Sequence, residues 1–224
     1  MKAITKILLI LAAGSVMTST IPALGEARGF YIQGDVGGNI TEDIDLKEFF
    51  GPVAPGSKVK LDPGLRLGVT GGYQVNDWFA GEVELGVVAN TIDSITGATR
   101  VHDATFVNVP FLVNAKFQYQ NKTPFTPFIG AGVGFSESIF DVDSVTLNNI
   151  TLSGDDAVAV FAYQAFAGLR YRLNEKMGLS LEYRYFATDS PHWHADVSFG
   201  TASDTLSFGG SHTHSISLAF DFRF

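Results

Sequence analysis

The stretch Ser215-Ile216-Ser217-Leu218-Ala219-Phe220-Asp221-Phe222-Arg223-Phe224 decides the fold. Apolar residues alternate along it with polar or small ones, and successive side chains of a β-strand point to opposite faces of the sheet. One face is therefore apolar, and it carries Ile216, Leu218, Phe220, Phe222 and Phe224. The other face carries Asp221 and Arg223. A soluble sheet would bury the apolar face against a second layer, whereas a membrane barrel turns it toward lipid and keeps the charges inside.

The same alternation recurs seven times earlier in the chain. Large aliphatic and aromatic residues oppose polar or small residues at about residues 30–40, 65–75, 79–87, 107–119, 129–135, 161–172 and 179–185. We therefore expect an all-β protein that forms a closed, antiparallel, eight-stranded transmembrane β-barrel. Ten strands are the alternative, if one of the long connections contains a hairpin.

The connections between these strands alternate in length. Three are short turns around Asn76, Asn121 and Asn174, and four are long, at about residues 41–62, 90–103, 137–156 and 187–210. Short periplasmic turns and long extracellular loops are typical of outer-membrane barrels. Aromatic residues gather near the short turns, as expected at a membrane interface. They are Tyr73, Trp78, Phe79, Phe117, Tyr119, Phe125, Tyr171, Phe222 and Phe224.

The first residues have the features of a secretory signal peptide. Lys2 and Lys6 flank the start of a short apolar run at residues 7–13, and Ala23-Leu24-Gly25 supplies small residues before a cleavage site. The run is far shorter than the ~20 residues of a membrane-spanning helix. We expect residues 1–25 to be the signal peptide and residues 26–224 to form the barrel domain, with cleavage after Ala27 as the alternative.

The composition fits a barrel in lipid. Hydrophobic residues make up 46% of the chain and charged residues only 17%, against about 25% charged residues in a typical soluble domain. The chain has no cysteine, so no disulfide framework is expected. A net charge of −8 argues against a nucleic-acid partner, which would require clustered lysine and arginine.

The sequence resembles the family of small eight-stranded outer-membrane barrels that includes OmpA- and OmpX-type barrels and the opacity-like surface proteins. The run at residues 127–134 and the segments 168–173 and 181–185 carry the resemblance, together with the terminal strand. It implies a protein of the cell outer membrane, surrounded by lipid and lipopolysaccharide, with no cofactor. A soluble lipocalin-like barrel is the alternative, but it would leave several aromatic stripes in water.

The resemblance also implies a role for the last strand. In this family a terminal apolar stripe that ends in an aromatic residue is read by the barrel-assembly machinery. The expected assembly signal is therefore Ile216, Leu218, Phe220, Phe222 and Phe224.

Charged residues on the inward faces form an expected lumen network of five acids and six bases. They are Asp35, Glu82, Glu84, Glu182 and Asp221, with Arg66, Lys116, Arg170, Arg172, Arg184 and Arg223. The interior of an eight-stranded barrel is just wide enough for side chains to fill. Glu82 and Glu84 are expected at the same depth as Arg170 and Glu182, because the strands of a barrel are tilted alike. We therefore expect a plugged lumen and a structural or surface-interaction role; a small porin passing ions or small solutes is the alternative.

Four of the five histidines form two pairs at the ends of the last long connection. The pairs are His192 with His194 and His212 with His214. Residues two apart on a strand share a face, so each pair offers two imidazoles to one metal ion. The interpretation that we favour is that these histidines are polar-tipped residues of a membrane interface.

The sequence gives weaker indications of other functions. Asp189, Ser190 and His192 lie close together, as do Ser211 and His212, and an outer-membrane lipid-modifying hydrolase would need such groups. Neighbours on a strand point to opposite faces, so adjacency does not make a catalytic triad, and we expect no enzyme. The long connections are acidic, and solubility explains this most simply. Divalent-cation binding beside lipopolysaccharide phosphates, or contact with an extracellular ligand or host surface, is the alternative.

Overall fold

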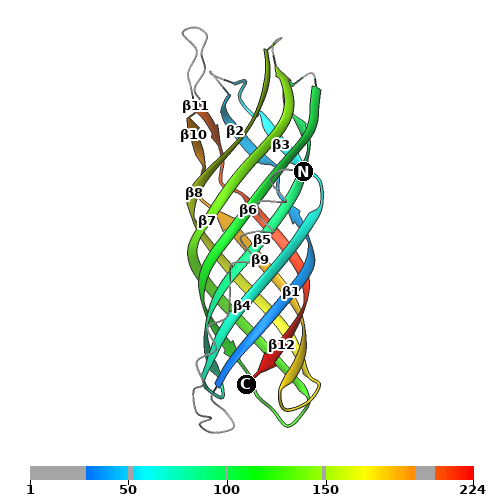
Figure 1. Ribbon diagram of the computed structural model, residues 1–224, viewed down its shortest axis with the longest axis vertical. Helices are drawn as coiled ribbons and strands as arrows, with labels where there is room; N and C mark the ends of the chain where they lie inside the picture. Colours follow the sequence, from blue (N-terminus) through cyan, green and yellow to red (C-terminus); the bar gives the residue numbers. More distant parts are fainter. Residues whose placement is uncertain (1–28, 50–52, 99, 148–149, 195–204) are drawn as a thin grey trace.

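The computed structural model describes residues 29–49, 53–98, 100–147, 150–194 and 205–224, and within them eight long strands close into an antiparallel barrel (Figure 1). The barrel strands are β1 (Gly29–Thr41), β4 (Gly64–Asn76), β5 (Phe79–Ile95), β6 (Arg100–Gln118), β7 (Phe125–Leu147), β8 (Ile150–Arg172), β9 (Met177–Thr188) and β12 (His212–Arg223). Each pairs with the next in this order, and β1 pairs with β12 to close the ring. The predicted fold class and the count of eight strands are confirmed. No helix among the described residues is long and apolar enough to cross a membrane.

The side chains alternate between the two faces of the wall as the sequence predicts. Ile216, Leu218 and Phe220 are 63%, 55% and 46% exposed, while Ser217 and Ala219 between them are buried. The outward face is apolar around the whole ring, as a surface in contact with lipid must be. Near the short turns, Trp78 stacks on Phe117 with ring centroids 5.9 Å apart, and Phe125 lies 5.1 Å from Tyr171.

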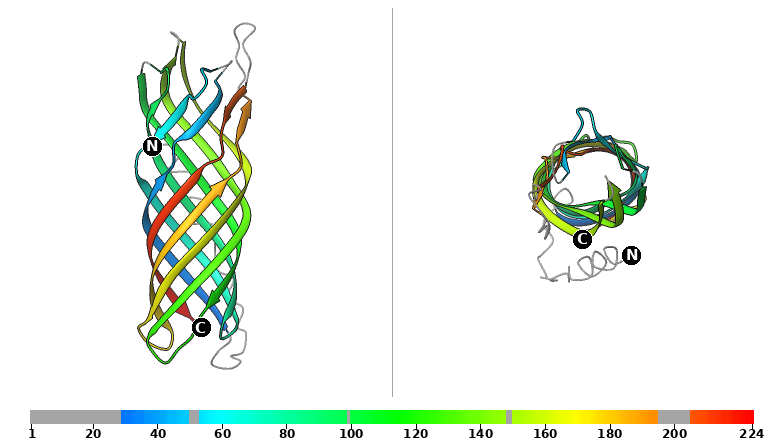
Figure 2. Two further views of the ribbon diagram at one scale, coloured as in Figure 1. Left: turned by 180° about the vertical axis from the view of Figure 1, so that it is seen from behind. Right: turned by 90° about the horizontal axis from the view of Figure 1, so that it is seen from above.

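The strands continue well beyond the length that a bilayer requires. β7 and β8 have 23 residues each, whereas about 9–11 residues of a tilted strand cross the membrane. At the end opposite the short turns, four short strands extend the wall: β2 (Ile44–Phe49), β3 (Lys58–Leu61), β10 (His192–His194) and β11 (Thr205–Phe208). β11 pairs with β2, β2 with β3, and β3 with the outer part of β5 (Figure 2).

This outer extension corrects the predicted loops. Much of residues 41–62, 90–103, 137–156 and 187–210 is β-structure rather than irregular chain. The first and last of these connections do contain hairpins, β2–β3 and β10–β11. They lengthen the outer end and leave the ring at eight strands. The predicted signal peptide lies outside the described residues and stays a prediction.

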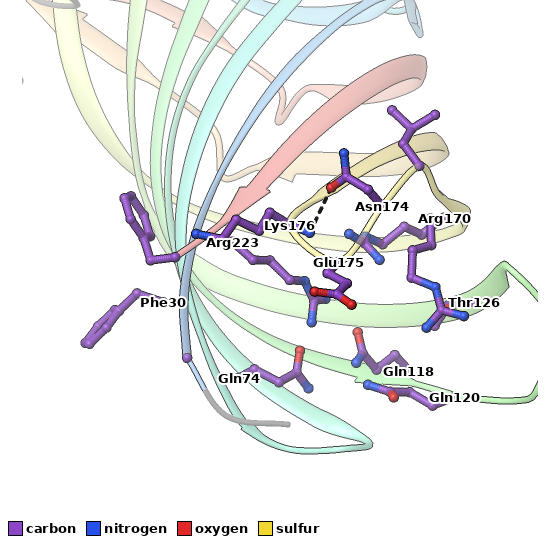
Figure 3. Close-up of a pocket in the computed structure, with 14 residues that line it drawn as sticks. Phe30, Gln74, Gln118, Gln120, Thr126, Arg170, Asn174, Glu175, Lys176 and Arg223 are labelled. Atoms are coloured by element: carbon purple, nitrogen blue, oxygen red, sulfur yellow. Dashed lines mark hydrogen bonds between the residues drawn. The ribbon is translucent and has the colours of Figure 1, made fainter. Parts of the chain in front are cut away.

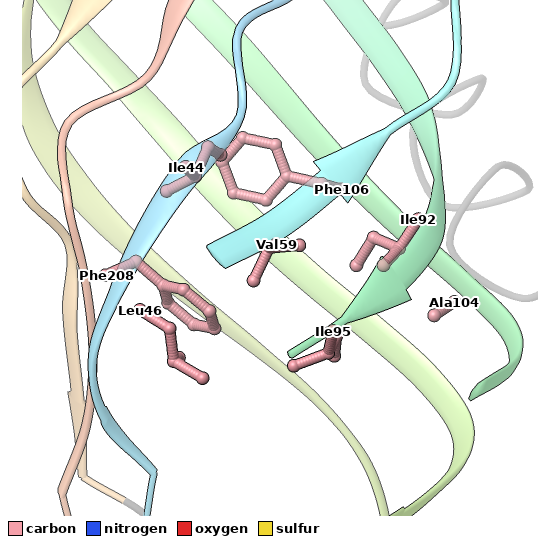
Figure 4. Packing of buried hydrophobic residues seen from close by; sticks show 8 residues of the cluster. All are labelled: Ile44, Leu46, Val59, Ile92, Ile95, Ala104, Phe106 and Phe208. Atoms are coloured by element: carbon pink, nitrogen blue, oxygen red, sulfur yellow. The ribbon is translucent and has the colours of Figure 1, made fainter. Parts of the chain in front are cut away.

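The outer extension has an apolar interior. Its inward-facing side chains pack as one cluster, whose buried members come from five strands (Figure 4). The buried members are Ile44, Leu46, Val59, Ile92, Ile95, Ala104, Phe106 and Phe208. The outward neighbours along the same strands, such as Lys58 and Lys60, are exposed. The extension therefore has its own hydrophobic core, the arrangement expected of a protein surrounded by water.

Candidate functional site

The centre of the lumen is organised around Glu84 on β5. Its carboxylate is fully buried and accepts hydrogen bonds from four other strands. Arg184 Nη1 on β9 lies 2.8 Å from Oε2, Gln164 Nε2 on β8 lies 2.7 Å away, and Asn114 Nδ2 on β6 lies 3.0 Å away. Arg66 Nη2 on β4 donates to Oε1. Since β5 and β9 lie four strands apart in a ring of eight, the Glu84–Arg184 pair spans the lumen.

The two arginines that meet Glu84 extend the network to further carboxylates. Arg66 Nε lies 3.2 Å from Asp35 Oδ2, and Arg184 Nη2 lies 3.1 Å from Glu182 Oε2. Gln33 then donates to the second oxygen of Glu182, at 2.8 Å. Buried ion pairs are favourable only when such additional hydrogen bonds satisfy the remaining oxygens and protons. Side-chain amides supply such bonds to Glu84 and Glu182, whereas Asp35 Oδ1 and Arg66 Nη1 are buried without a hydrogen-bond partner.

A second cluster lies on Glu82. Its Oε1 accepts hydrogen bonds from Tyr31 and from Lys116 Nζ, which is 3.1 Å away. The ammonium of Lys116 also lies over the ring of Phe128, 4.5 Å from its centroid. The Tyr31 ring fits because residue 72 on the neighbouring strand is glycine, where a Cβ would come within 2.3 Å of the ring.

A third ion pair lies nearer the short turns. Arg170 on β8 makes two parallel hydrogen bonds to Asp221 on β12, at 2.7 and 2.6 Å. The guanidinium passes over β9 at Gly178, where a Cβ would lie 2.4 Å from its nitrogens. This bidentate geometry is the strong form of an arginine–carboxylate contact.

The structure brings most of the predicted lumen residues together, with two differences. Arg172 is exposed at the short-turn mouth, because it is the last residue of β8. Arg223 is half-buried and lies 3.8 Å from Asp221. Glu84 pairs with Arg184 and Arg66, and Arg170 pairs with Asp221, while the similar depth of Glu82, Glu84, Arg170 and Glu182 stays a prediction. Side chains reach across the lumen, so distance from the turn does not fix the partner.

Two uncharged levels lie beyond the charged one, toward the outer end. Amide and hydroxyl groups form the first: Asn90 donates to Asn39 at 2.7 Å, and Thr41 lies 2.9 Å from both Asn90 Oδ1 and Thr213 Oγ1. Ser138 and Asn108 are joined in the same way, at 2.7 Å. The apolar cluster of the outer extension forms the second level. The lumen therefore changes from charged, through neutral polar, to apolar along its length.

The short-turn end opens into a cavity of about 720 Å³ (Figure 3). Its lining comes from β1, β4, β6, β7, β8 and β12 and from the turn between β8 and β9. Four cationic side chains, of Arg170, Arg172, Lys176 and Arg223, line it together with one carboxylate, Glu175. The amides of Gln74, Gln118 and Gln120 complete the polar lining.

The histidines of β12 face outward, into an aromatic belt at the outer end of the barrel. His212 Nδ1 lies 2.7 Å from the Tyr185 hydroxyl, and His214 Nδ1 lies 2.7 Å from the Tyr183 hydroxyl. His214 Nε2 is 3.3 Å from Glu42. The side chains of His192 and His194 lie outside the described part, and the described residues contain no group of three or more histidine or acidic side chains able to hold a metal ion. Binding of a metal by these four histidines therefore stays a prediction.

The serines near these histidines do not form a triad among the described side chains. Ser211 faces the lumen, 2.9 Å from the Thr188 hydroxyl, while the neighbouring His212 faces outward. Ser190 Oγ accepts a hydrogen bond from Lys47 at 3.1 Å. Of the acidic residues in the third long connection, Glu137 is exposed and Asp141 is half-buried. The side chains of Asp143, Asp155 and Asp156 are outside the description.

The lumen also holds residues that the charge pattern alone does not identify. Gln33, Asn114, Gln164 and Tyr31 each donate to a buried carboxylate. All four occupy inward positions of the alternating pattern, and that is the signal that could have found them. Their partners follow from the register and the curvature of the wall.

The fold, the apolar outer face and the ion-paired lumen define a small membrane β-barrel. The family model of the outer membrane protein beta-barrel domain matches residues 7–224, so the chain belongs to that family. This assignment places the protein in the outer membrane, in contact with its lipid. Comparison of the sequence with curated proteins gives no significant match.

Solved structures of outer-membrane proteins share the fold. OprG from Pseudomonas aeruginosa is similar with a TM-score of 0.58 and 17% identity, covering 88% of this chain and 96% of that one. AlkL, whose structure was solved in lipid bilayers, has a TM-score of 0.55 and 19% sequence identity, and the match covers 93% of this chain and 97% of AlkL. Neisserial surface protein A has a TM-score of 0.52 and 16% sequence identity, and the match covers 88% of this chain and 97% of that protein. At these identities the likeness concerns the fold alone.

Proposed function

We propose that this protein is a non-conducting, non-catalytic outer-membrane barrel with a structural and surface-interaction role. The observation that carries the proposal is the Glu84–Arg184 ion pair, 2.8 Å long, between strands on opposite sides of the lumen. An ion crossing the barrel would have to separate this pair. Leaving either charge buried without its partner costs about 3–5 kcal/mol, so the closed state is favoured.

The levels above the charged centre support the same proposal. In the neutral level, Thr41 and Asn39 are hydrogen-bonded to Asn90, and Ser138 to Asn108. The outer extension is filled by apolar side chains, which offer no ligands to a hydrated ion. A porin would instead keep a continuous water-filled path.

The surface role rests on the outer extension. Its exposed face is rich in charged residues, including Asp45, Lys47, Lys58, Lys60 and Asp93. A rigid wall with its own core holds these side chains beyond the bilayer, where they would meet lipopolysaccharide, an extracellular ligand or a host surface. We also infer that β12 is the strand that the barrel-assembly machinery reads, because its outward face is apolar from Ile216 to the end of the strand.

Planar-bilayer recording of the purified protein tests the proposal. We expect small or absent conductance from the wild type at neutral pH. The variant with both Glu84→Ala and Arg184→Ala removes the central pair, and any rise of its conductance over the wild type measures how far this pair closes the lumen. A steady, large, ion-selective current from the unmutated protein would reject the plugged lumen and establish the porin alternative.

A further inference from the structure

The cavity at the short-turn mouth differs in charge from the rest of the molecule. The chain has a net charge of −8, yet Arg170, Arg172, Lys176 and Arg223 line this cavity with Glu175 as the only acidic side chain among the lining residues. All four cations come from β8, β12 and the turn between β8 and β9, and Figure 3 shows Arg170, Lys176 and Arg223 around the cavity. The resulting positive potential is local and directed at the cavity.

Asp221 neutralises Arg170, whereas the other three cations have no close carboxylate partner in the described part of the chain. Asp221 is engaged by both nitrogens of the Arg170 fork, and Arg223 shares the same carboxylate only at 3.8 Å. Within the described ranges, neither Arg172 nor the ammonium of Lys176 forms an ion pair. Lys176 lies over the Phe222 ring, 5.9 Å from its centroid. The mouth therefore keeps donors available for an anion.

The walls also define where a ligand enters and how large it is. Lining residues come from six of the eight barrel strands, so the cavity opens along the barrel axis rather than sideways into lipid. Because the short turns face the periplasm, the entry is periplasmic. A volume of about 720 Å³ lies within the range of sites that hold small organic molecules.

We propose that this cavity is a periplasmic binding site for a small, soluble polyanion that carries phosphate or carboxylate groups. Arg172 and Arg223 bind its phosphate or carboxylate groups through paired N–H donors, a geometry that guanidinium groups favour. Lys176 adds a third positive charge at the rim. The glutamine amides provide hydrogen bonds to the uncharged part of the ligand.

Isothermal titration of the folded protein in detergent at 0.15 M NaCl tests this site, with pyrophosphate and citrate as probes. We expect saturable binding of at least one probe with one site per chain. Tighter binding of pyrophosphate would assign the site to phosphates, and tighter binding of citrate would assign it to carboxylates. Because hydrogen bonds to charged groups are strong, Arg172→Gln and Arg223→Gln should each weaken binding by about tenfold or more.

Lys122→Gln is the matched control. Lys122 is exposed in the short turn between β6 and β7, at the same end of the barrel, and it does not line the cavity. Its replacement should leave binding unchanged. No saturable binding of either probe, or an equal loss in Lys122→Gln and Arg172→Gln, would overturn the proposal. Arg172 is exposed, so its variant should fold even if Arg223→Gln does not, and a shift in gel mobility on boiling verifies folding.

Discussion

The ring of Tyr31 on β1 occupies the space in which residue 72 on β4 would carry a side chain. A Cβ at Gly72 would lie 2.3 Å from Cζ of Tyr31 and 2.6 Å from its hydroxyl oxygen. That hydroxyl donates to the buried carboxylate of Glu82. A glycine in the wall is therefore needed for a hydrogen bond in the lumen.

Gly72→Ala should displace the Tyr31 ring and destabilise the barrel by about 1–3 kcal/mol, the usual cost of overpacking. Gly71→Ala is the control, because nothing lies within 4 Å of a Cβ at that neighbouring, outward-facing position. Urea unfolding in lipid vesicles measures both variants. Equal stability of the two would show that Tyr31 has room to move.

Glu84→Ala should lower the free energy of unfolding by about 3–5 kcal/mol, because it leaves Arg66 and Arg184 buried without their shared carboxylate. Glu137→Ala, on an exposed outward position of β7, should change stability by less than about 0.5 kcal/mol. The double variant Glu84→Ala with Arg184→Ala should lose less free energy of unfolding than the two single variants together, because the two residues interact directly. Additive costs would mean that the pair contributes no coupling energy.

Phe106→Ala should loosen the outer extension while the membrane barrel stays intact. Phe106 is 4% exposed within the apolar cluster, and such truncations cost about 3–5 kcal/mol. We expect limited proteolysis to cut near β2 and β3, with the heat-sensitive gel mobility of the barrel unchanged. Thr105→Ala, at the adjacent outward position, should not alter cleavage. Unaltered cleavage of Phe106→Ala would mean that the cluster does not hold the extension together.

Phe224→Asp should impair insertion into the outer membrane and leave periplasmic protein that proteases degrade, because a charge at the interface interrupts the apolar stripe of β12. Tyr119→Asp is a suitable comparison, since Phe224 and Tyr119 are 74% and 70% exposed and both lie at the short-turn end. Fractionation of cells expressing each variant gives the result. Normal assembly of Phe224→Asp would remove the argument that this residue directs folding.

The alternating pattern predicted the barrel, its eight strands and the faces of residues such as Glu84 and Leu218, because a period of two depends only on local backbone geometry. The outer extension was missed because the polarity of the two faces inverts there. On β3, Val59 points inward and Lys58 and Lys60 outward, the opposite of the membrane-facing strands. A search for strands whose apolar residues point outward therefore finds only the part of each strand that contacts lipid.

The ion-pair partners could not be predicted from the sequence for a different reason. Arg170 reaches Asp221 by crossing an intervening strand at Gly178. Such contacts depend on the curvature of the closed wall and on which neighbouring positions lack a side chain. The alternation along one strand shows that a residue points inward, whereas its ion-pair partner depends on how all eight strands are arranged around the lumen.

The Glu84–Arg184 pair also bears on how the barrel folds. The two residues are 100 positions apart in the chain, and their strands face each other only when the wall has curled round to bring β1 against β12. An open sheet would hold the two charges apart, so we expect this contact to form only on ring closure. Contacts absent from the transition state mainly slow unfolding. We therefore expect the Glu84–Arg184 pair to slow the unfolding of the closed barrel.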